Sequence, residues 1–301
     1  MKMASEEDLK VYIHERFFQK YSVDRRIYCV PVDEDEENRL ETQHDILLRF
    51  FEDKLFLAPI EYPEKVLECG YGRGHWVVQV AEEYEDCEVL GIDIFTENLP
   101  EQPENLELSG YNLNDRLNDA GLFERNAYDL IHSRFVGQGI KSRRWESYVL
   151  DMRRLLKPGG WLEMMEYYPN IQSDSGLLSD RSALTQWWNN YVDAMERCNR
   201  SPRIGQRLKS LMMEAGLRNV YGTRVSVPIG EWPSDATRAS IGRDMIGMVG
   251  ALLTSLAIWP FTEKLGWTVE QVKALTDAAQ RELRDPRLKL YMPVYYAYGR
   301  R

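Results

Sequence analysis

The sequence predicts a doubly wound α/β fold, with helices on both faces of a largely parallel sheet. Two junctions carry this prediction. Residues 65–76, KVLECGYGRGHW, form a short apolar run that turns through three glycines into a helical pattern. Residues 157–166, KPGGWLEMME, place a helix stop and a tight turn before another apolar run. Strand and helix patterns alternate between these junctions, as expected for such a sheet.

The glycine turn predicts a ligand site. Gly70, Gly72 and Gly74 are spaced two apart, and glycine tolerates positive φ and lets a ligand approach bare backbone. A dinucleotide fingerprint starting at Gly70 needs a glycine at position 75, where this chain has His75. The pattern that begins at Glu68, E-x-G-x-G-x-G, therefore indicates a different nucleotide-like ligand. Taken alone, it is also compatible with a plain turn.

A second strand supports the ligand interpretation. Residues 88–92 form an apolar strand that ends in Asp93, at the distance downstream where an acid binds the two hydroxyls of a ribose. Strand, glycine turn, helix, strand and terminal acid then follow one another in the order that a nucleotide site requires.

The elements before and after this unit follow from periodicity. We expect an amphipathic helix over residues 5–20, because Leu9, Tyr12, Ile13 and Phe17 have helical spacing. An acidic run from residue 33 opens a second helix, since acids suit a helix start. The further expected elements are strands at 105–108, 128–135, 218–227 and 290–298, and helices at 142–156, 180–198, 204–215, 236–257 and 269–283.

Composition excludes several classes of function. The chain has 301 residues, enough for one large α/β domain with embellishments or with a helical cap. Its net charge of -10, with 38 basic against 48 acidic residues and no basic block, argues against a nucleic-acid partner. The four cysteines show no metal-ligand spacing, so we expect reduced thiols and no metal site.

The sequence shows no pattern typical of a signal peptide or of a membrane span. The charged N-terminus is unlike a signal peptide. The apolar stretch 245–261 contains glycines and a proline and is shorter than the ~20 residues of a membrane span. We therefore expect a buried helix or pocket wall there, no membrane partner, and a cytoplasmic protein, with the nucleus as the alternative.

Residues 37–60, ENRLETQHDILLRFFEDKLFLAPI, resemble the LaeA-like (UMTA-type) fungal methyltransferase family. In that family an acidic helix with Arg-Leu and Gln-His pairs leads to Lys-Leu-Phe-Leu-Ala-Pro just before the glycine motif. The Lys-Pro-Gly-Gly turn, the His-x-Arg-Phe pattern at 132–135 and the C-terminal residues 265–301 are similar to it as well. The resemblance covers the chain from about residue 33 to its end.

The resemblance implies a class I methyltransferase (Rossmann-like) fold with seven strands in the order 3214576, the last antiparallel, plus N-terminal helices and a helical cap. The implied divisions are an N-terminal helical lid at 1–60, a cofactor-binding core at 61–168, and cap insertions with the last two core strands at 169–301.

The implied cofactor is S-adenosylmethionine. By resemblance, Glu68 fixes its amino group, Gly70, Gly72 and Gly74 contact the methionine and ribose region, and Asp93 binds the ribose. Arg134 holds the carboxylate or else cross-links the sheet edge. The family usually has two aspartates beside the adenine; here Ser-Gly-Tyr-Asn stands at 109–112, with Tyr111 and Asn112 as the substitutes.

The chemistry needs few catalytic groups. Methyl transfer from a sulfonium is an in-line displacement, and alignment alone is worth ~7 to 11 kcal/mol. Where a base is used, histidine suits neutral pH. His132 is our candidate for base or substrate contact; the alternative is a strand histidine bonded to a neighbouring loop. His75 is either structural or reaches the methionine end of the cofactor, and His44 either organises its helix or faces the pocket. His14 is expected on a surface helix. Glu166 faces substrate or pairs with Arg134.

The expected activity is methylation, at oxygen or nitrogen, of a small and largely apolar acceptor of secondary metabolism. The aromatic residues Trp187, Trp188, Tyr191, Trp259 and Phe261 fit either a substrate pocket or a core. One alternative is a LaeA-like regulator that works through protein partners; another is a biosynthetic enzyme that has kept the fold for a non-methylating step such as cyclisation. A protein partner or a homodimer stays open.

Overall fold

The computed structural model describes residues 9–96 and 101–301, which form two compact units. Unit 1 comprises the N-terminal residues up to Asp53 with Tyr168–Pro202 and Val225–Val294, and unit 2 comprises Lys54–Tyr167, Arg203–Arg224 and Tyr295–Arg301. The expected three-part division therefore differs from the compact units: the N-terminal segment shares a unit with the cap helices, and the last two long strands pass from one unit to the other.

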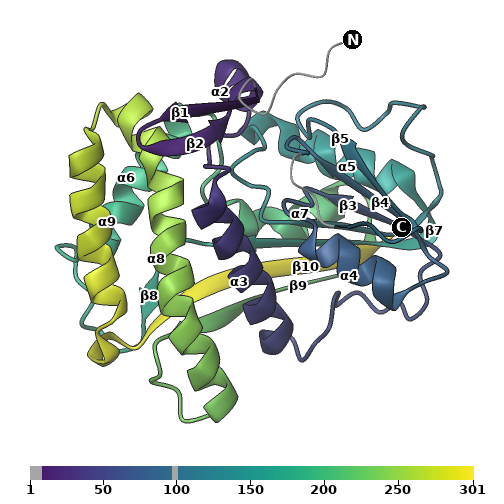
Figure 1. Ribbon diagram of the computed structural model, residues 1–301. Helices are drawn as coiled ribbons and strands as arrows, with labels where there is room; N and C mark the ends of the chain where they lie inside the picture. Colours follow the sequence, from purple (N-terminus) through teal and green to yellow (C-terminus); the bar gives the residue numbers. More distant parts are fainter. Residues whose placement is uncertain (1–8, 97–100) are drawn as a thin grey trace. The chain divides into compact units, whose positions relative to one another are not determined.

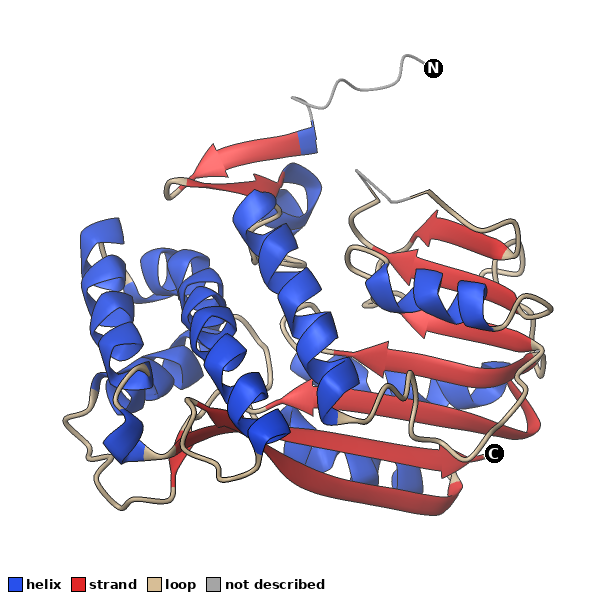
Figure 2. Ribbon diagram, turned by 60° about the horizontal axis from the view of Figure 1, so that its bottom comes forward, coloured by secondary structure: helices blue, strands red, loops and turns tan. Residues whose placement is uncertain are grey.

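The larger of the two sheets has parallel core strands (Figure 2). Its order is β5-β4-β3-β6-β7-β10, with β9 paired to β10, which confirms the predicted order 3214576. A short strand, β8 (Gln172–Ser173), adds an unexpected antiparallel pair with β10. The other strands are β3 (Lys65–Cys69), β4 (Glu88–Asp93), β5 (Leu106–Gly110), β6 (Tyr128–Arg134), β7 (Leu156–Tyr167), β9 (Arg218–Ile229) and β10 (Leu290–Arg300).

Every adjacent pair in the series β5-β4-β3-β6-β7 is parallel, so the carboxyl ends of these strands share one edge. The strands read as nearly continuous apolar runs because both faces are covered. The helices of unit 2 are α4 (His75–Glu83), α5 (Trp145–Leu155) and α7 (Leu208–Glu214), with 3-10 turns at Ser142–Arg144 and Ile204–Arg207. Trp145, Tyr148 and Met152 of α5 are buried in the core against this sheet. No helix occurs in the β5 to β6 connection, residues 111–127.

Unit 1 is a helical bundle built from α3 (Glu34–Phe50), α6 (Ala183–Arg197), α8 (Ala236–Leu265) and α9 (Val269–Leu283) (Figure 1). Helix α8 packs on each of the other three. It extends past the expected end at residue 257, through Pro260 to Gly266, which adopts φ 72. By length and composition it resembles a membrane span, but 72% of its most apolar window is buried, as in a core helix.

Helix α3 contains a buried ion pair between Arg39 and Glu36, and α8 donates a hydrogen bond to it. The Arg39 guanidinium donates to both oxygens of Glu36, at 3.0 and 2.7 Å, and to Gln43 Oε1 at 2.8 Å. Ser255 Oγ of α8 donates to Glu36 Oε2 at 2.6 Å. His44 is also buried in α3. The Arg-Leu and Gln-His pairs that marked the resemblance therefore contribute polar groups to the interior of the bundle.

The expected helix over residues 5–20 is wrong for its described part. Residues 10–19 form a hairpin of β1 (Lys10–Ile13) and β2 (Arg16–Gln19), followed by α2 (Lys20–Arg25); residues 5–8 lie outside the described chain. His14 and Glu15 take φ of 51° and 61°, which turns the chain back on itself. Tyr12 and Phe17 then face each other across the strands, with ring centroids 4.9 Å apart. These two residues, whose spacing suggested a helical stripe, form a cross-strand pair instead.

Candidate cofactor site

The three glycines form the turn between β3 and α4. Gly70, Gly72 and Gly74 have φ of 90°, 58° and 83°. Residues other than glycine rarely adopt positive φ. Gly74 is the N-cap of α4, so the first amides of that helix point out of the turn. A Cβ on Gly70 would lie 2.4 Å from Val136 Cγ1, which leaves no room for a side chain. The glycine turn therefore has the conformation that the sequence predicted.

Asp93, at the end of β4, closes the turn from the adjacent strand. Its Oδ2 accepts from the Gly72 amide at 2.9 Å, and its Oδ1 accepts from the Phe95 amide at 3.0 Å. Burial raises the pKa of Asp93 to about 6, while these amides lower it. A hydrogen bond from the Ile94 backbone lowers this pKa as well, and the side chain is partly exposed. The carboxylate is thus fixed beside the glycines and can still accept hydroxyl groups.

Glu68 is the most unusual acid of the site. It lies on β3, two residues before Gly70, and is 1% exposed. Its Oε1 lies 3.5 Å from His132 Nδ1, and its Oε2 has no hydrogen-bond donor within the described part of the chain. Burial raises the pKa of Glu68 to about 8, although Arg134 opposes that shift. A buried carboxyl oxygen that lacks a donor fits the ammonium group of a ligand.

Arg134 ends β6 and lies in the field of Glu68 and Glu163. Burial lowers its pKa, and both carboxylates act to raise it. The structure therefore places an acid and a guanidinium together near the glycine turn. This arrangement suits a ligand that carries both an ammonium and a carboxylate, and it is compatible with either role predicted for Arg134.

The structure does not support His132 as a base that contacts an acceptor. The ring is 1% exposed and stacks on Trp76 with centroids 3.8 Å apart and an interplanar angle of 14°. Parallel register puts it between Glu68 and Glu163 on β3 and β7. Because Trp76 of α4 reaches over β6, the imidazole is enclosed within unit 2.

Trp76 and Glu163 are site residues that sequence reasoning missed. Trp76 Nε1 donates to the Leu55 carbonyl at 2.6 Å. Glu163 Oε2 accepts from the amides of Leu57 and Ala58 at 2.7 and 2.6 Å, and burial raises its pKa to about 7. The Leu-Phe-Leu-Ala segment before β3 is therefore bonded to α4 and β7. The sequence signal that could have identified Glu163 is the position of an acidic residue within the otherwise apolar strand 161–167.

Glu166 has a structural contact close to the site. Its Oε1 accepts from the Val136 amide at 2.8 Å, and burial raises its pKa to about 8. Glu166 therefore fixes the turn that follows β6, the same turn that packs Val136 against Gly70. Neither substrate contact nor a pair with Arg134 is needed to explain its position.

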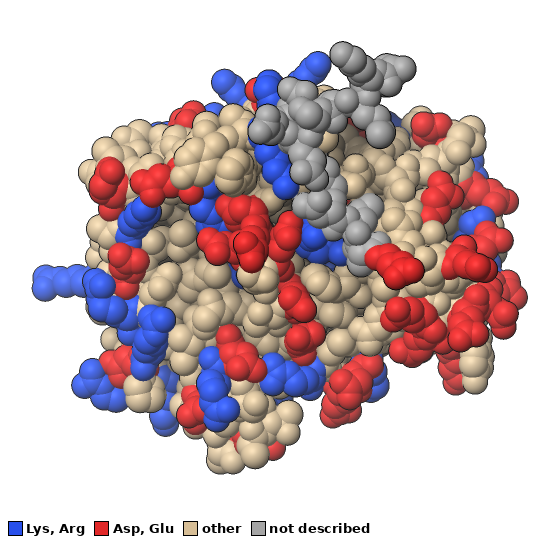
Figure 3. All heavy atoms as spheres, in the orientation of Figure 1, with Lys and Arg blue, Asp and Glu red and all other residues tan. Residues whose placement is uncertain are grey.

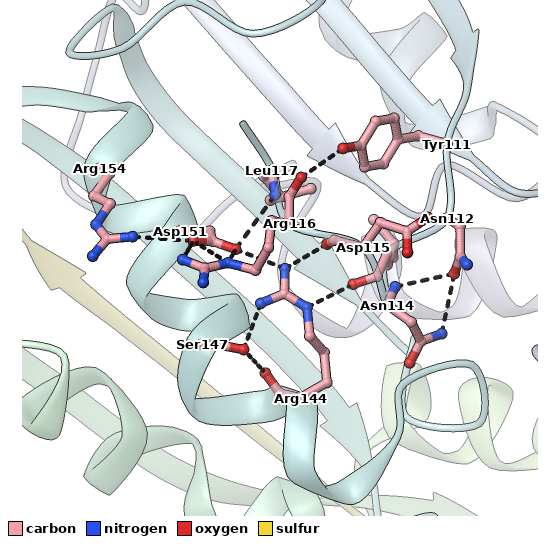
Figure 4. Close-up of polar contacts among 11 residues, drawn as sticks. Tyr111, Asn112, Asn114, Asp115, Arg116, Leu117, Arg144, Ser147, Asp151 and Arg154 are labelled. Atoms are coloured by element: carbon pink, nitrogen blue, oxygen red, sulfur yellow. Dashed lines mark hydrogen bonds and ion pairs between the residues drawn. The ribbon is translucent and has the colours of Figure 1, made fainter. Parts of the chain in front are cut away.

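Tyr111 and Asn112 lie in the loop that follows β5, at the position where the family usually has aspartates (Figure 4). Tyr111 Oη donates to the Arg116 carbonyl at 2.6 Å, and its ring packs edge-on against Phe123. Asn112 Oδ1 accepts from the amide and the side chain of Asn114, at 3.0 and 3.1 Å. Both side chains thus make contacts that shape the loop, and a contact with adenine stays a prediction.

The same loop is anchored by the buried Asp151 of α5 (Figure 4). Arg116 donates to both of its oxygens, and Arg144 Nη2 donates to Oδ2 at 2.8 Å. Arg144 also donates to the carbonyls of Leu113 and Asp115. Burial alone would raise the pKa of Asp151, but the two guanidinium groups hold it below its usual value.

Of the remaining candidates, His75 adjoins the glycine turn, and the others belong to unit 1. His75 is the first residue of α4. In unit 1, His14 Nε2 lies 2.9 Å from Glu263 Oε1. The aromatic residues expected to form a pocket or a core belong to unit 1 and are buried there; Trp187 stacks on Tyr191, with centroids 4.9 Å apart, and packs near Phe261. For these three the core interpretation describes the packing.

S-adenosylmethionine fits the residues of unit 2. Glu68 and Arg134 would hold its amino acid end, the glycine turn would take its methionine and ribose region against bare backbone, and Asp93 would bind the ribose hydroxyls. The buried Glu68 oxygen that has no donor among the described residues is the observation on which this fit depends.

Comparison with known proteins identifies the family of this chain. A family model described as a methyltransferase domain matches residues 37–221, more than half of the chain. The methyltransferase pytC of Aspergillus terreus is 29% identical over 277 residues, which cover 90% of this chain and 82% of the relative. The secondary metabolism regulator LAE1 of Cochliobolus heterostrophus is 27% identical over 284 residues, covering 92% and 91%.

Among solved structures, a Haemonchus contortus phosphoethanolamine N-methyltransferase 2 in complex with phosphomonomethylethanolamine and S-adenosylhomocysteine matches with a TM-score of 0.48 and 17% identity. The match covers 87% of this chain and 52% of that one, so the chain spans about half of that structure's length. The family match and the glycine site together lead to one assignment: this chain belongs to the S-adenosylmethionine-dependent methyltransferase family, on its LaeA-like fungal branch.

Proposed function

We propose that the protein transfers a methyl group from S-adenosylmethionine to an oxygen or nitrogen of a small, largely apolar acceptor of secondary metabolism. The observation that carries this proposal is the glycine turn with Asp93 and with Glu68, whose Oε2 has no donor among the described residues. The relatives named as methyltransferases and regulators of secondary metabolism support the metabolic context.

In this proposal the residues of the chain bind the cofactor and align it with the nucleophile, and they transfer no proton. The cofactor supplies an activated methyl group, so the nucleophile needs alignment above all. Glu68 and Arg134 orient the amino acid end, and Asp93 fixes the ribose. The burial of His132 supports this proposal. Its ring stacks on Trp76 and is 1% exposed, as expected for a packing role and not for contact with an acceptor.

The test uses S-adenosylmethionine with a deuterated methyl group. We would incubate the purified protein with a panel of hydroxyl- and amine-bearing aromatic and terpenoid compounds and follow both products by mass spectrometry. The proposal expects one acceptor to gain the labelled methyl in step with S-adenosylhomocysteine formation. Asp93→Ala should abolish both, whereas Asp277→Ala in α9, an exposed position, should change neither.

The alternatives give different outcomes in the same experiment. A product that forms without S-adenosylhomocysteine would indicate a non-methylating step such as cyclisation. The regulator hypothesis is favoured by the LAE1 similarity. It expects no methylated small molecule, and a stable protein partner that still binds the Asp93→Ala variant.

A further inference from the structure

The negative charge of this protein is concentrated in one stretch of sequence. Residues 74–115 contain eleven Asp and Glu residues and neither Lys nor Arg. The whole chain has 48 acidic and 38 basic residues, so 37 acids remain elsewhere against all 38 basic residues. The rest of the chain is therefore almost neutral. Figure 3 shows acidic side chains gathered on one side of the visible face.

These acids are not placed to stabilise their own helix. Glu82 and Glu83 end α4, and Glu85 and Asp86 follow in the next turn; all four are exposed. The carboxyl end of a helix carries a partial negative charge, which favours cations there, yet the last turn of α4 has no basic residue. A role outside local folding explains the concentration better.

The acidic stretch borders a cleft of about 790 Å³ in unit 2. Four of its lining residues begin the parallel strands: Lys65 of β3, Glu88 of β4, Leu106 of β5 and Tyr128 of β6. The cleft thus lies at the amino edge of the sheet, whereas the glycine turn follows the carboxyl end of β3. An occupant of the cleft would leave the cofactor site open.

The cleft has an apolar floor and an acidic rim. Buried side chains of Leu90, Leu106, Phe123 and Tyr128 form the floor. The rim carries four exposed acids, Glu88, Glu104, Glu107 and Glu124, and one exposed arginine, Arg125. Asn105, another lining residue, donates through Nδ2 to the carbonyls of Ala81, Tyr84 and Cys87, which ties the acidic turn after α4 to the cleft wall.

The cleft exists because a crossover helix is replaced by a loop. Parallel neighbours in a sheet are usually joined by a helix that covers the strands. Here the connection from β5 to β6, residues 111–127, is irregular, and residues 120–125 of that loop form one wall. The apolar side chains near the start of β4 and β5 therefore line a groove, because no helix covers them.

We propose that this cleft is a docking surface for a protein segment that presents Lys or Arg side chains around an apolar anchor. The acidic rim attracts cations and repels nucleic acid and acidic proteins. The floor accepts an apolar side chain. Lys65 bridges Glu88 and Glu124 at 2.9 and 3.2 Å, so those two acids already have a cation. Glu104 and Glu107 are the rim residues that we assign to the partner.

The test measures binding of a fluorescent peptide that alternates Lys with Leu and Phe to the full chain by anisotropy. We expect saturable binding that weakens as salt rises, and at least about a tenfold loss in the double variant Glu104→Lys with Glu107→Lys. The matched control, Glu214→Lys with Asp277→Lys, changes the net charge equally at two exposed positions outside the cleft and should bind within about twofold of wild type.

Several results would overturn the proposal. Equal losses in both double variants would reveal a general attraction to an acidic protein. Undiminished binding of a peptide with Ser in place of Leu and Phe would show that the floor is not used, and no binding of the original peptide would remove the surface altogether. Self-association of the chain that disappears in the rim variant would identify a second copy as the occupant. Cofactor binding, measured in parallel, should stay unchanged and reports on folding.

Discussion

Asp151 and Glu68 are both buried acids of unit 2, but their surroundings are opposite. Asp151 accepts from Arg116 and Arg144, and its pKa lies below the usual value. Glu68 has His132 Nδ1 at 3.5 Å and an oxygen without a donor among the described residues, and its pKa is raised to about 8. The first carboxylate has its counter-charges within the chain, whereas the second lacks part of them. We infer from this difference that Asp151 stabilises a loop, whereas Glu68 binds a ligand.

The largest effect expected from this comparison is on stability. Asp151→Ala leaves the buried Arg144 without its carboxylate, and we expect a loss of about 3 to 5 kcal/mol in the free energy of unfolding. Chemical denaturation measures this. Asp277→Ala, at an exposed position, should change the same quantity by less than about 0.5 kcal/mol. A loss below about 1 kcal/mol for Asp151→Ala would mean that the network is not a major support of the loop.

The second effect is on affinity. Glu68→Gln replaces a buried carboxyl that is largely protonated at pH 5 by a neutral amide, so near that pH the free energy of unfolding should stay within roughly 1 kcal/mol of wild type. Affinity for S-adenosylmethionine should fall by at least about tenfold, or about 1.4 kcal/mol, because the amide cannot neutralise an ammonium. Calorimetric titration gives the dissociation constant. Equal affinities in the two proteins would place the ammonium elsewhere.

The third effect is on the pH dependence of stability, and it has opposite signs for the two acids. The pKa of Glu68 is raised in the folded state, so the folded chain binds the extra proton and loses stability as pH rises from about 4.5 to about 8. The pKa of Asp151 is lowered, so its contribution is present above its usual pKa of 3.8 and is lost in more acidic solution.

Denaturation at several pH values separates the two groups. The difference between wild type and Glu68→Gln should change by at most about 1.4 kcal/mol per pH unit between pH 5 and pH 8. For Asp151→Asn the difference from wild type should instead change below about pH 4. Parallel curves for wild type and Glu68→Gln would show that this carboxyl is ionised throughout.

The parts of the structure that follow from local pattern were predicted from sequence. Gly70, Gly72 and Gly74 adopt the positive φ that their spacing indicated, and Asp93 reaches back to the turn from the end of the next strand. Strand order follows from the alternation of elements together with the family resemblance. Each of these features depends on neighbours in sequence or on a regular topology.

Features that depend on distant partners were not predicted. The enclosure of His132 requires Trp76 to cross over β6, and the role of Glu163 requires two amides about a hundred residues away in sequence. The N-terminal hairpin likewise depends on the left-handed turn at His14 and Glu15, for which the apolar spacing gives no signal. Asp151 was not singled out because its partners come from three different segments.

Proton release on cofactor binding tests the central claim most directly. At pH 7 the Glu68 carboxyl, with its pKa near 8, is largely protonated, and an ammonium placed beside it would drive that proton off. Titration of S-adenosylmethionine in two buffers of different ionisation enthalpy gives the number of protons released. We predict a release approaching one proton for wild type and much less for Glu68→Gln. Binding to wild type without proton release would contradict the assignment of Glu68 to the ammonium group.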